Sequence, residues 1–257
     1  MLRICVACLL LICDHKIFAE TEVADDAELL NSKNWLINDP KAFYGGNRTG
    51  AMLDERKNKD SMGKFVRIRD EALSRTDGFT DGEVVDALDH YFWGMRNGIA
   101  MELGALDGSR HKHSMTFDFE HYFGWKRILI EGNPFFRSDL RRHSPLALTV
   151  NAAICSTPSI VHYTQSHYVG GIVEFMAIDF LEKWHPKIYN LCAPSCNVST
   201  LDYSLLTHLV KTVECIPLSD VLQHAEIKHI NYFVLDVEVS NFFFARKCFL
   251  IFFLTFF

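Results

Sequence analysis

Two acidic residues, Glu102 and Glu131, lie at the ends of apolar runs, and each is followed by a turn of small residues. Glu102 precedes the turn Gly104–Ser109, and Glu131 precedes Gly132–Pro134 about one strand–helix–strand unit later. Such a run predicts a buried parallel strand whose carboxyl end reaches a ligand, because open α/β sheets bind ligands at that edge. An acid after the second strand can accept hydrogen bonds from both hydroxyls of a ribose. The two acids therefore predict a nucleoside-cofactor site.

The spacing of glycines in the first turn separates two classes of cofactor. A pyrophosphate cofactor needs G-x-G-x-x-G, because the third glycine brings a helix N-terminus against the phosphates. The turn Gly104–Gly108 lacks this pattern, and Glu102 and Asp107 place carboxylates that would repel a diphosphate. The same carboxylates would attract a sulfonium and an ammonium group in a shielded site. We therefore expect S-adenosylmethionine as the cofactor, and the missing fingerprint weakens an NAD-dependent oxidoreductase.

Five short motifs in chain order resemble those of a known family. They are Glu102–Ser109, Gly124-Trp125, Leu129–Pro134, Asn151–Ile154 and Leu235–Glu238. Together they resemble the FkbM-type S-adenosylmethionine-dependent methyltransferase domain, and the resemblance covers roughly Ile99 to Glu238. It implies an α/β fold with a parallel, Rossmann-like class I methyltransferase sheet. It also implies O-methylation of a hydroxyl acceptor such as a glycan or a small molecule.

The resemblance also assigns parts of the cofactor to particular residues. The methionine portion would lie around Gly104–Ser109, the ribose at Glu131, and the adenine near Asn151 and Ala152. The candidate cofactor-binding residues are Glu102, Gly104, Ala105, Asp107, Gly108, Ser109, Glu131, Asn133, Asn151 and Ala152.

Asp236 and Glu238 are the candidate catalytic residues, because the resemblance places them near the methyl-transfer face. Alternate residues at a strand end point the same way, so the two acids could form a general-base or metal-binding pair. A structural role is the alternative, in which an acid at this strand end caps a neighbouring turn or contacts the cofactor ammonium.

Methyl transfer from a sulfonium needs little covalent help from the protein. Catalysis would come from positioning the acceptor and from a base that takes its proton. The alternative of another class is a non-catalytic secretory-pathway interaction protein that retains the methyltransferase-like fold. A net charge of −6 provides no basic field for phosphates, which disfavours nucleic acid as a partner.

The residues after Glu238 depart from the family pattern. Val239–Phe257 is crowded with Phe, Leu and Ile and shows no helical or strand periodicity. We interpret this segment as an aberrant tail, translated from an unspliced intron, and therefore expect a truncated sheet that ends after its fourth strand. A membrane tail is the alternative, although about ten apolar residues are well short of the ~20 that span a bilayer. We expect no useful activity from such a chain, because its fourth strand would have an exposed edge.

The first residues resemble a secretory signal peptide, predicted to span residues 1–19. Arg3 precedes the apolar run Ile4–Cys13, and Ala19 ends a short polar region. A signal anchor is the alternative, so the membrane is a partner only if this segment stays uncleaved. Two glycosylation sequons, Asn47–Thr49 and Asn197–Ser199, agree with a location in the secretory-pathway lumen or outside the cell.

Four cysteines beyond the leader precede the tail. Cys192 and Cys196 could pair with each other, or one of them could reach Cys215, in an oxidising lumen. Buried or free thiols are the alternative. We predict no metal, because no second spaced pair completes a four-ligand zinc site.

The composition, 49% hydrophobic and 23% charged over 257 residues, fits one globular domain with an N-terminal extension. We expect residues 20–78 to be a loosely structured polar extension and 79–238 to be the methyltransferase-like domain. The expected strands are 99–103, 127–131, 147–152 and 232–236, and the expected helices are 83–91, 114–123, 135–142 and 218–224.

An insert of about residues 156–212 is long enough to be functional or mobile. We expect its aromatic residues, Tyr168 and Trp184 among them, to be local core rather than a sugar platform.

Overall fold

The structure is a computed structural model that describes residues 4–5, 35–38, 40–45, 84, 86–87, 90–92, 95, 97–109, 114–166, 169–194 and 196–236. Its strands are β1 (Ile4–Cys5), β2 (Ile99–Leu103), β3 (Lys126–Ile130), β4 (Leu148–Val150), β5 (Ala153–Ile154), β6 (Ser159–Thr164), β7 (Val210–Ile216) and β8 (Tyr232–Leu235). Its α-helices are α2 (Pro40–Gly45), α5 (Phe117–Phe123), α6 (Arg137–His143), α7 (Ile178–Trp184), α8 (Pro186–Cys192) and α9 (Leu218–His224). The 3-10 helices are η3 (Pro134–Phe136), η4 (Val173–Phe175), η5 (Val198–Thr200) and η6 (Tyr203–Leu206).

The main sheet has the strand order β1-β8-β2-β3-β4. Strands β8, β2, β3 and β4 are parallel to one another, and only β1 is antiparallel. The apolar runs of β2, β3 and β4 are buried, as expected for parallel strands that are covered on both faces. If the four parallel strands are numbered as they occur in the chain, their order in the sheet from β8 to β4 is 4-1-2-3. Successive strands are added on one side of β2 up to β4, and β8 is then added on its other side, so the strand order reverses between β2 and β8. Read in the opposite direction, the strand order is 3-2-1-4, the order of the first four strands of a doubly wound sheet, and the expected α/β, Rossmann-like arrangement is present to that extent.

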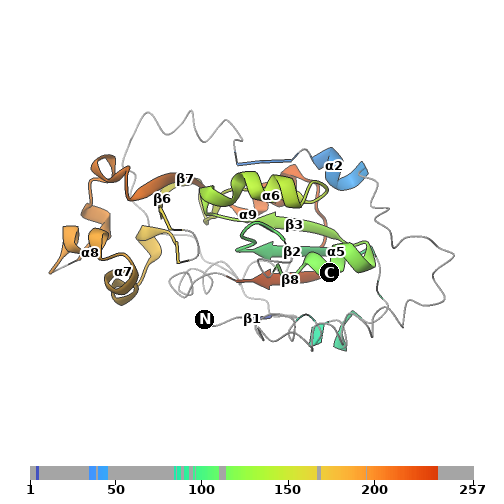
Figure 1. Cartoon of the computed structure of the whole chain (residues 1–257). Coiled ribbons are helices and arrows are strands. Elements are labelled where there is room, and N and C mark those ends of the chain that lie inside the picture. The colour runs from blue at the N-terminus through green and yellow to red at the C-terminus, as the bar shows by residue number, and fades with distance from the viewer. Residues whose placement is uncertain are drawn as a thin grey trace.

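Helices cover both faces of this sheet (Figure 1). On one face, Ala100 of β2 packs with Phe119 of α5, and Leu129 of β3 packs with Leu140 of α6. On the other face, Met101 and Ile128 belong to a cluster shared with Phe43 of α2 and with Val221 and Leu222 of α9. Side chains alternate between faces along a strand, so neighbouring residues of β2 and β3 reach opposite helical layers.

The expectation of a loose extension over residues 20–78 is wrong for residues 35–38 and 40–45. Trp35 and Phe43 are buried in the cluster under β2 and β3. The backbone at Trp35 and Ile37 bonds to Asn151 and Thr149, so this segment lies along the outer edge of β4. The surrounding residues are mostly polar, so the average composition of the segment did not indicate that Trp35 and Phe43 would be buried.

Residues 153–216, which we call the lobe, fill the position of the predicted insert. They form a second sheet with the order β5-β7-β6, and α7 and α8 pack beside it. Figure 1 shows the lobe beyond the carboxyl ends of β2, β3 and β8. The lobe is regular structure with its own apolar clusters, rather than an irregular excursion.

Two disulfides lie in the lobe. Cys192 pairs with Cys196, which confirms one of the expected pairings. Cys215 pairs with Cys155 across 60 residues, so the expectation that Cys215 might join one of the other two is wrong. Both Cys155 and Cys215 are buried where β5 and β7 meet. This second bond therefore joins the two ends of the lobe.

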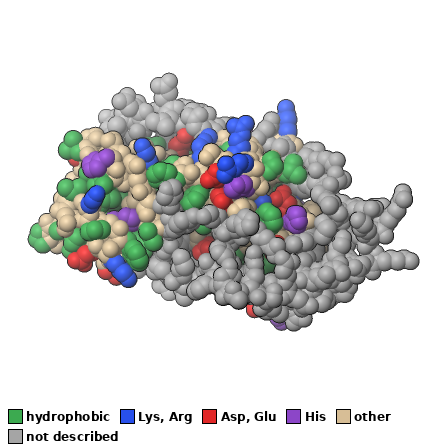
Figure 2. Space-filling model, viewed as in Figure 1, with side chains coloured by type: hydrophobic (Ala, Val, Ile, Leu, Met, Phe, Trp, Pro, Cys, Tyr) green, Lys and Arg blue, Asp and Glu red, His purple; other side chains and the backbone are tan. Residues whose placement is uncertain are grey.

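The surface of the lobe carries exposed apolar side chains, visible as green atoms in Figure 2. Trp184 is 46% exposed and Leu191 is 55% exposed, so the expectation of Trp184 as local core is wrong. Tyr168, predicted with it, lies outside the described residues. Within the described part of the chain, no helix is long and apolar enough to cross a membrane.

The outer edge of β8, expected to be exposed, is paired over two residues with β1. Ile4 lies opposite Leu235, and Cys5 lies opposite Val234. The other leader residues, Glu238, the tail after it, the sequon Asn47–Thr49 and most of the extension lie outside the described residues.

Candidate functional site

The four parallel strands end at one edge, where polar residues follow three of them. Gly104 follows β2, Glu131 follows β3, Asn151 follows β4 and Asp236 follows β8. Backbone bonds continue past the strand ends, from the amide of Asp236 to Leu103 and from the amide of Gly104 to Ile130. The predicted site residues are therefore brought together, with Gly104 and Asp236 at the point where the strand order reverses. Ligands of open α/β sheets bind at such a point.

Two glycines allow the turn after β2 to lie close to its neighbours. Gly104 has φ 89°, and a Cβ there would collide with the carbonyl oxygen of Asp236. Gly108 has φ 68°, and a Cβ there would lie 2.7 Å from Ser144 Oγ. Both positions need left-handed backbone and no side chain, which only glycine supplies without strain. The glycines pack the turn against β8 on one side and against the end of α6 on the other.

Glu131 connects this turn to the end of β3. Its side chain is buried, and its two carboxylate oxygens accept hydrogen bonds from the amide of Leu106 at 2.8 Å and the amide of Asn133 at 2.6 Å. Burial raises the pKa of Glu131 to about 7, the two amide bonds oppose the shift, and the charges of Glu102 and Asp236 add to it. The carboxylates of Glu102 and Asp236 therefore both lie within electrostatic reach of Glu131 at the edge of the sheet.

Asn133 and Asn151 hold the neighbouring strand ends. The side-chain amide of Asn151 donates to the carbonyl of Glu131 at 2.7 Å and to that of Asn133 at 3.1 Å. The side-chain oxygen of Asn133 accepts from the amide of Phe135, the second residue of η3, and its amide group donates to the carbonyl of Ser166 in the lobe. Ala152 is buried in the apolar cluster behind Asn151. These residues shape the backbone around Glu131.

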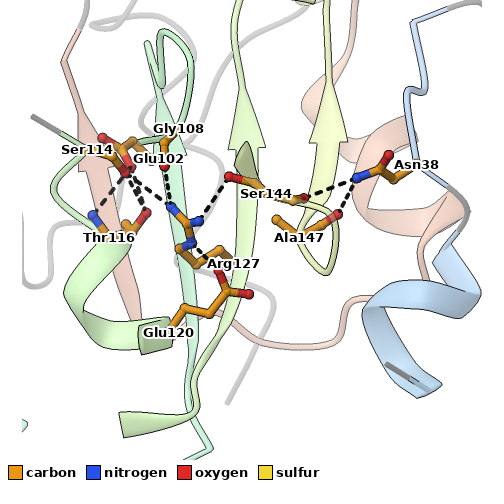
Figure 3. Close-up of polar contacts among 9 residues, drawn as sticks. All are labelled: Asn38, Glu102, Gly108, Ser114, Thr116, Glu120, Arg127, Ser144 and Ala147. Atoms are coloured by element: carbon orange, nitrogen blue, oxygen red, sulfur yellow. Dashed lines mark hydrogen bonds and ion pairs between the residues drawn. The ribbon is translucent and has the colours of Figure 1, made fainter. Parts of the chain in front are cut away.

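Glu102 faces the other way, toward the start of α5 (Figure 3). Its buried carboxylate accepts hydrogen bonds from Ser114 Oγ at 2.7 Å, Thr116 Oγ1 at 2.6 Å and the amide of Met115 at 2.9 Å. Burial raises the pKa of Glu102, and these hydrogen bonds together with the charge of Arg127 lower it. The carboxylate thus fixes the chain segment that leads into α5. Its charge also acts on Glu131 at the end of β3.

Arg127 on β3 is the residue that sequence reasoning missed. It is 1% exposed, and its guanidinium donates to Glu120 Oε2 at 2.7 Å, to the carbonyl of Gly108 at 3.0 Å and to Ser144 Oγ at 3.0 Å. A further bond reaches Ser114 Oγ at 3.2 Å. Figure 3 shows that one side chain joins the glycine turn, α5 and the end of α6. The available signal was an arginine within a predicted buried strand, directly before the apolar residues Ile128–Ile130.

Asp107 stabilises the far end of the glycine turn. One oxygen of its buried carboxylate accepts from both the amide and the hydroxyl of Ser109, at 2.9 and 2.7 Å. The other oxygen lies 3.4 Å from His143 Nδ1 at the end of α6. The predicted binding residues Asp107 and Ser109 therefore bond to each other and shape the turn.

The chemistry of this edge is acidic. Glu102, Asp107 and Glu131 are buried, and the buried cation nearby, Arg127, is bonded to Glu120 beneath the turn. An environment of this kind favours a cationic ligand over a phosphate. Among the described residues, no three His, Cys, Asp or Glu side chains are grouped as a metal site. Glu238, the second candidate catalytic residue, lies beyond the described part of the chain.

Comparison of the chain with protein-family models, with curated proteins and with solved structures gave no match. The fold and the geometry of the strand ends are therefore the observations on which a functional proposal rests.

Proposed function

We propose that the edge of the sheet between β2 and β8 binds S-adenosylmethionine and that the fold serves methyl transfer to a hydroxyl acceptor. The observation that carries the proposal is Glu131. Its buried carboxylate is bonded to the glycine turn and lies within reach of two further acids. Each carboxylate oxygen has two lone pairs and accepts one hydrogen bond from a backbone amide, so it has capacity for a ribose hydroxyl.

The charge of the edge supports the same cofactor. S-adenosylmethionine supplies an electrophilic methyl group on a cationic sulfur. Glu131 would hold the ribose, and Asp236 at the end of β8 would attract the cationic portion, because opposite charges interact strongly away from bulk water. Because Gly104 has no side chain, the backbone of the turn lies close to the carbonyl of Asp236 at the neighbouring strand end.

The proton of the acceptor needs a base. Asp236 follows β8 at the point where the strand order reverses, which makes it the described residue best placed for this role. An acceptor hydroxyl positioned there would give its proton to a carboxylate as the methyl group is transferred. The lobe lies beyond the same edge and would form the acceptor side of the site (Figure 1).

The test is binding of S-adenosylmethionine to the full chain, measured by isothermal titration calorimetry. Glu131→Gln keeps the shape of the side chain and removes its charge, so we expect binding to weaken by about tenfold to a hundredfold. Glu182→Gln on the exposed surface of α7 is the matched control and should bind as the parent does. Circular dichroism checks that both variants fold.

Absence of binding to the full chain would contradict the proposal and favour the alternative, a non-catalytic secretory-pathway interaction protein on the same scaffold. Binding that Glu131→Gln leaves unchanged would place the cofactor elsewhere. Methyl transfer itself is tested with radiolabelled cofactor and a panel of glycans and small alcohols, in which Asp236→Asn should lower turnover more than it lowers cofactor affinity.

A further inference from the structure

We propose that Asn197 of the lobe is a site of N-linked glycosylation. The proposal concerns a covalent modification and does not depend on methyl transfer. Asn197-Val198-Ser199 has the acceptor pattern, with a hydroxyl two residues after the asparagine and no proline between them. The second sequon, at Asn47, lies outside the described residues, so the structure bears on Asn197 alone.

The side chain of Asn197 already contacts the sequon hydroxyl. Ser199 Oγ donates to Asn197 Oδ1 at 2.7 Å, and the amide of Ser199 donates to the same oxygen at 3.2 Å. Both bonds use the carboxamide oxygen, which leaves the nitrogen Nδ2 pointing away from them. Nδ2 has no hydrogen-bond partner among the described residues. The atom that would carry the sugar is therefore not held by a hydrogen bond to the described residues.

The surroundings of Asn197 leave room for a glycan. Asn197, Ser199 and Thr200 are exposed, and η5 buries none of its residues. The disulfide between Cys192 and Cys196 lies immediately before the sequon and holds that segment next to the end of α8. A sugar attached here would extend into solvent without displacing core side chains.

The disulfides indicate the compartment that the modification requires. Cys155–Cys215 and Cys192–Cys196 account for every described cysteine of the lobe. Disulfides of this kind form and persist in oxidising compartments such as the lumen of the endoplasmic reticulum. The oligosaccharide donor for N-glycosylation is present in the same lumen, so one location supplies both modifications.

The covalent step joins Asn197 to an oligosaccharide carried on a lipid pyrophosphate. A bond forms between Nδ2 and the anomeric carbon of the first sugar, and the bond from that carbon to the pyrophosphate oxygen breaks. The lipid pyrophosphate leaves with the electron pair, and Nδ2 loses one proton. The cell that expresses the chain supplies this lipid-linked donor, and its oligosaccharyltransferase catalyses the transfer.

The experiment expresses the full chain in cultured animal cells, with Asn47→Gln present so that only one sequon remains. We expect a shift in gel mobility that peptide-N-glycosidase removes, and mass spectrometry should locate the glycan on Asn197. Asn197→Gln and Ser199→Ala should both abolish the shift. Ser199→Thr keeps the sequon and should retain it, and Thr200→Ala, outside the sequon, should also retain it.

Two results would overturn the proposal. One is an unmodified Asn197 in the chain recovered from these cells. The other is a glycan that remains on the protein when Ser199 is replaced by alanine. Non-reducing peptide mapping of the same sample reports whether the two disulfides formed, so a failure to enter the oxidising lumen is seen directly and also counts against the proposal.

Discussion

The edge of the main sheet and the lobe are stabilised by different kinds of interaction. At the edge, directional hydrogen bonds from buried charged groups hold the backbone, with Arg127 and Glu102 at their centre. In the lobe, apolar packing and two disulfides hold the chain. The difference indicates where the positions of single atoms are fixed by directional bonds. The edge needs individual atoms in fixed positions, whereas the lobe needs only to remain folded and in place.

The largest expected effect breaks the network at the edge. Arg127→Met should destabilise the protein by about 3–5 kcal/mol, because Glu120 and the carbonyl of Gly108 lose a buried charged partner. Urea unfolding measures this. Arg127→Lys keeps the charge without the planar fork and should lie between parent and Arg127→Met. Equal stability of Arg127→Met and the parent would show that the network is dispensable.

The matching change in the lobe removes the bond between its two ends. The double variant Cys155→Ala/Cys215→Ala should lose about 2–4 kcal/mol, since the disulfide closes a loop of 60 residues in the unfolded chain. Hydrogen exchange should show faster exchange in β6 and β7 while β2 and β3 stay protected. Uniform loss of protection in both sheets would contradict the separation of the two regions.

The pH dependence of stability sharpens the comparison, because it originates at the edge. The pKa of Glu131 is raised from an ordinary 4.5 to about 7 on folding. Its contribution is therefore fully present below pH 4.5 and is lost as the pH rises through 7. The loss is roughly 3 kcal/mol between these values. Glu131→Gln should flatten this part of the curve of unfolding free energy against pH, and an unchanged slope would place its origin elsewhere.

The smallest expected effect concerns one backbone angle in the glycine turn. Leu106 is a non-glycine residue in the left-handed region, with φ 49°. Asparagine tolerates that region better than leucine does, so Leu106→Asn should stabilise the protein by up to about 1 kcal/mol. Thermal unfolding measures the shift. A lower melting temperature would mean that the leucine side chain packs usefully in the turn.

The strands of the main sheet were predictable because their signal is local. The expected strand 99–103 coincides with β2, and the expected helix 218–224 coincides with α9. The expected strand 147–152 is longer than β4, because the backbone after Val150 turns to carry Asn151 and then enters β5. Apolar runs and turn residues within a few positions determine such elements.

The interactions that stabilise the site were not predictable in the same way. The partners of Arg127 come from three separate segments, and Cys155 is 60 residues from Cys215. Glu102 was expected at the cofactor, but its carboxylate bonds to residues 114–116, because strand alternation directs it to the face covered by α5. Only the folded chain brings these groups together. The candidate cofactor and catalytic roles remain predictions that the binding experiment tests.

One consequence follows from the two ends of the Asn133 carboxamide. Its oxygen accepts a hydrogen bond from the amide of Phe135, and its nitrogen donates one to the carbonyl of Ser166 in the lobe. A shift of the lobe would therefore pull on the residue whose amide bonds to Glu131. Under the proposed function, binding of an acceptor at the lobe would therefore affect the position of Glu131, the proposed ribose ligand, through the single side chain of Asn133.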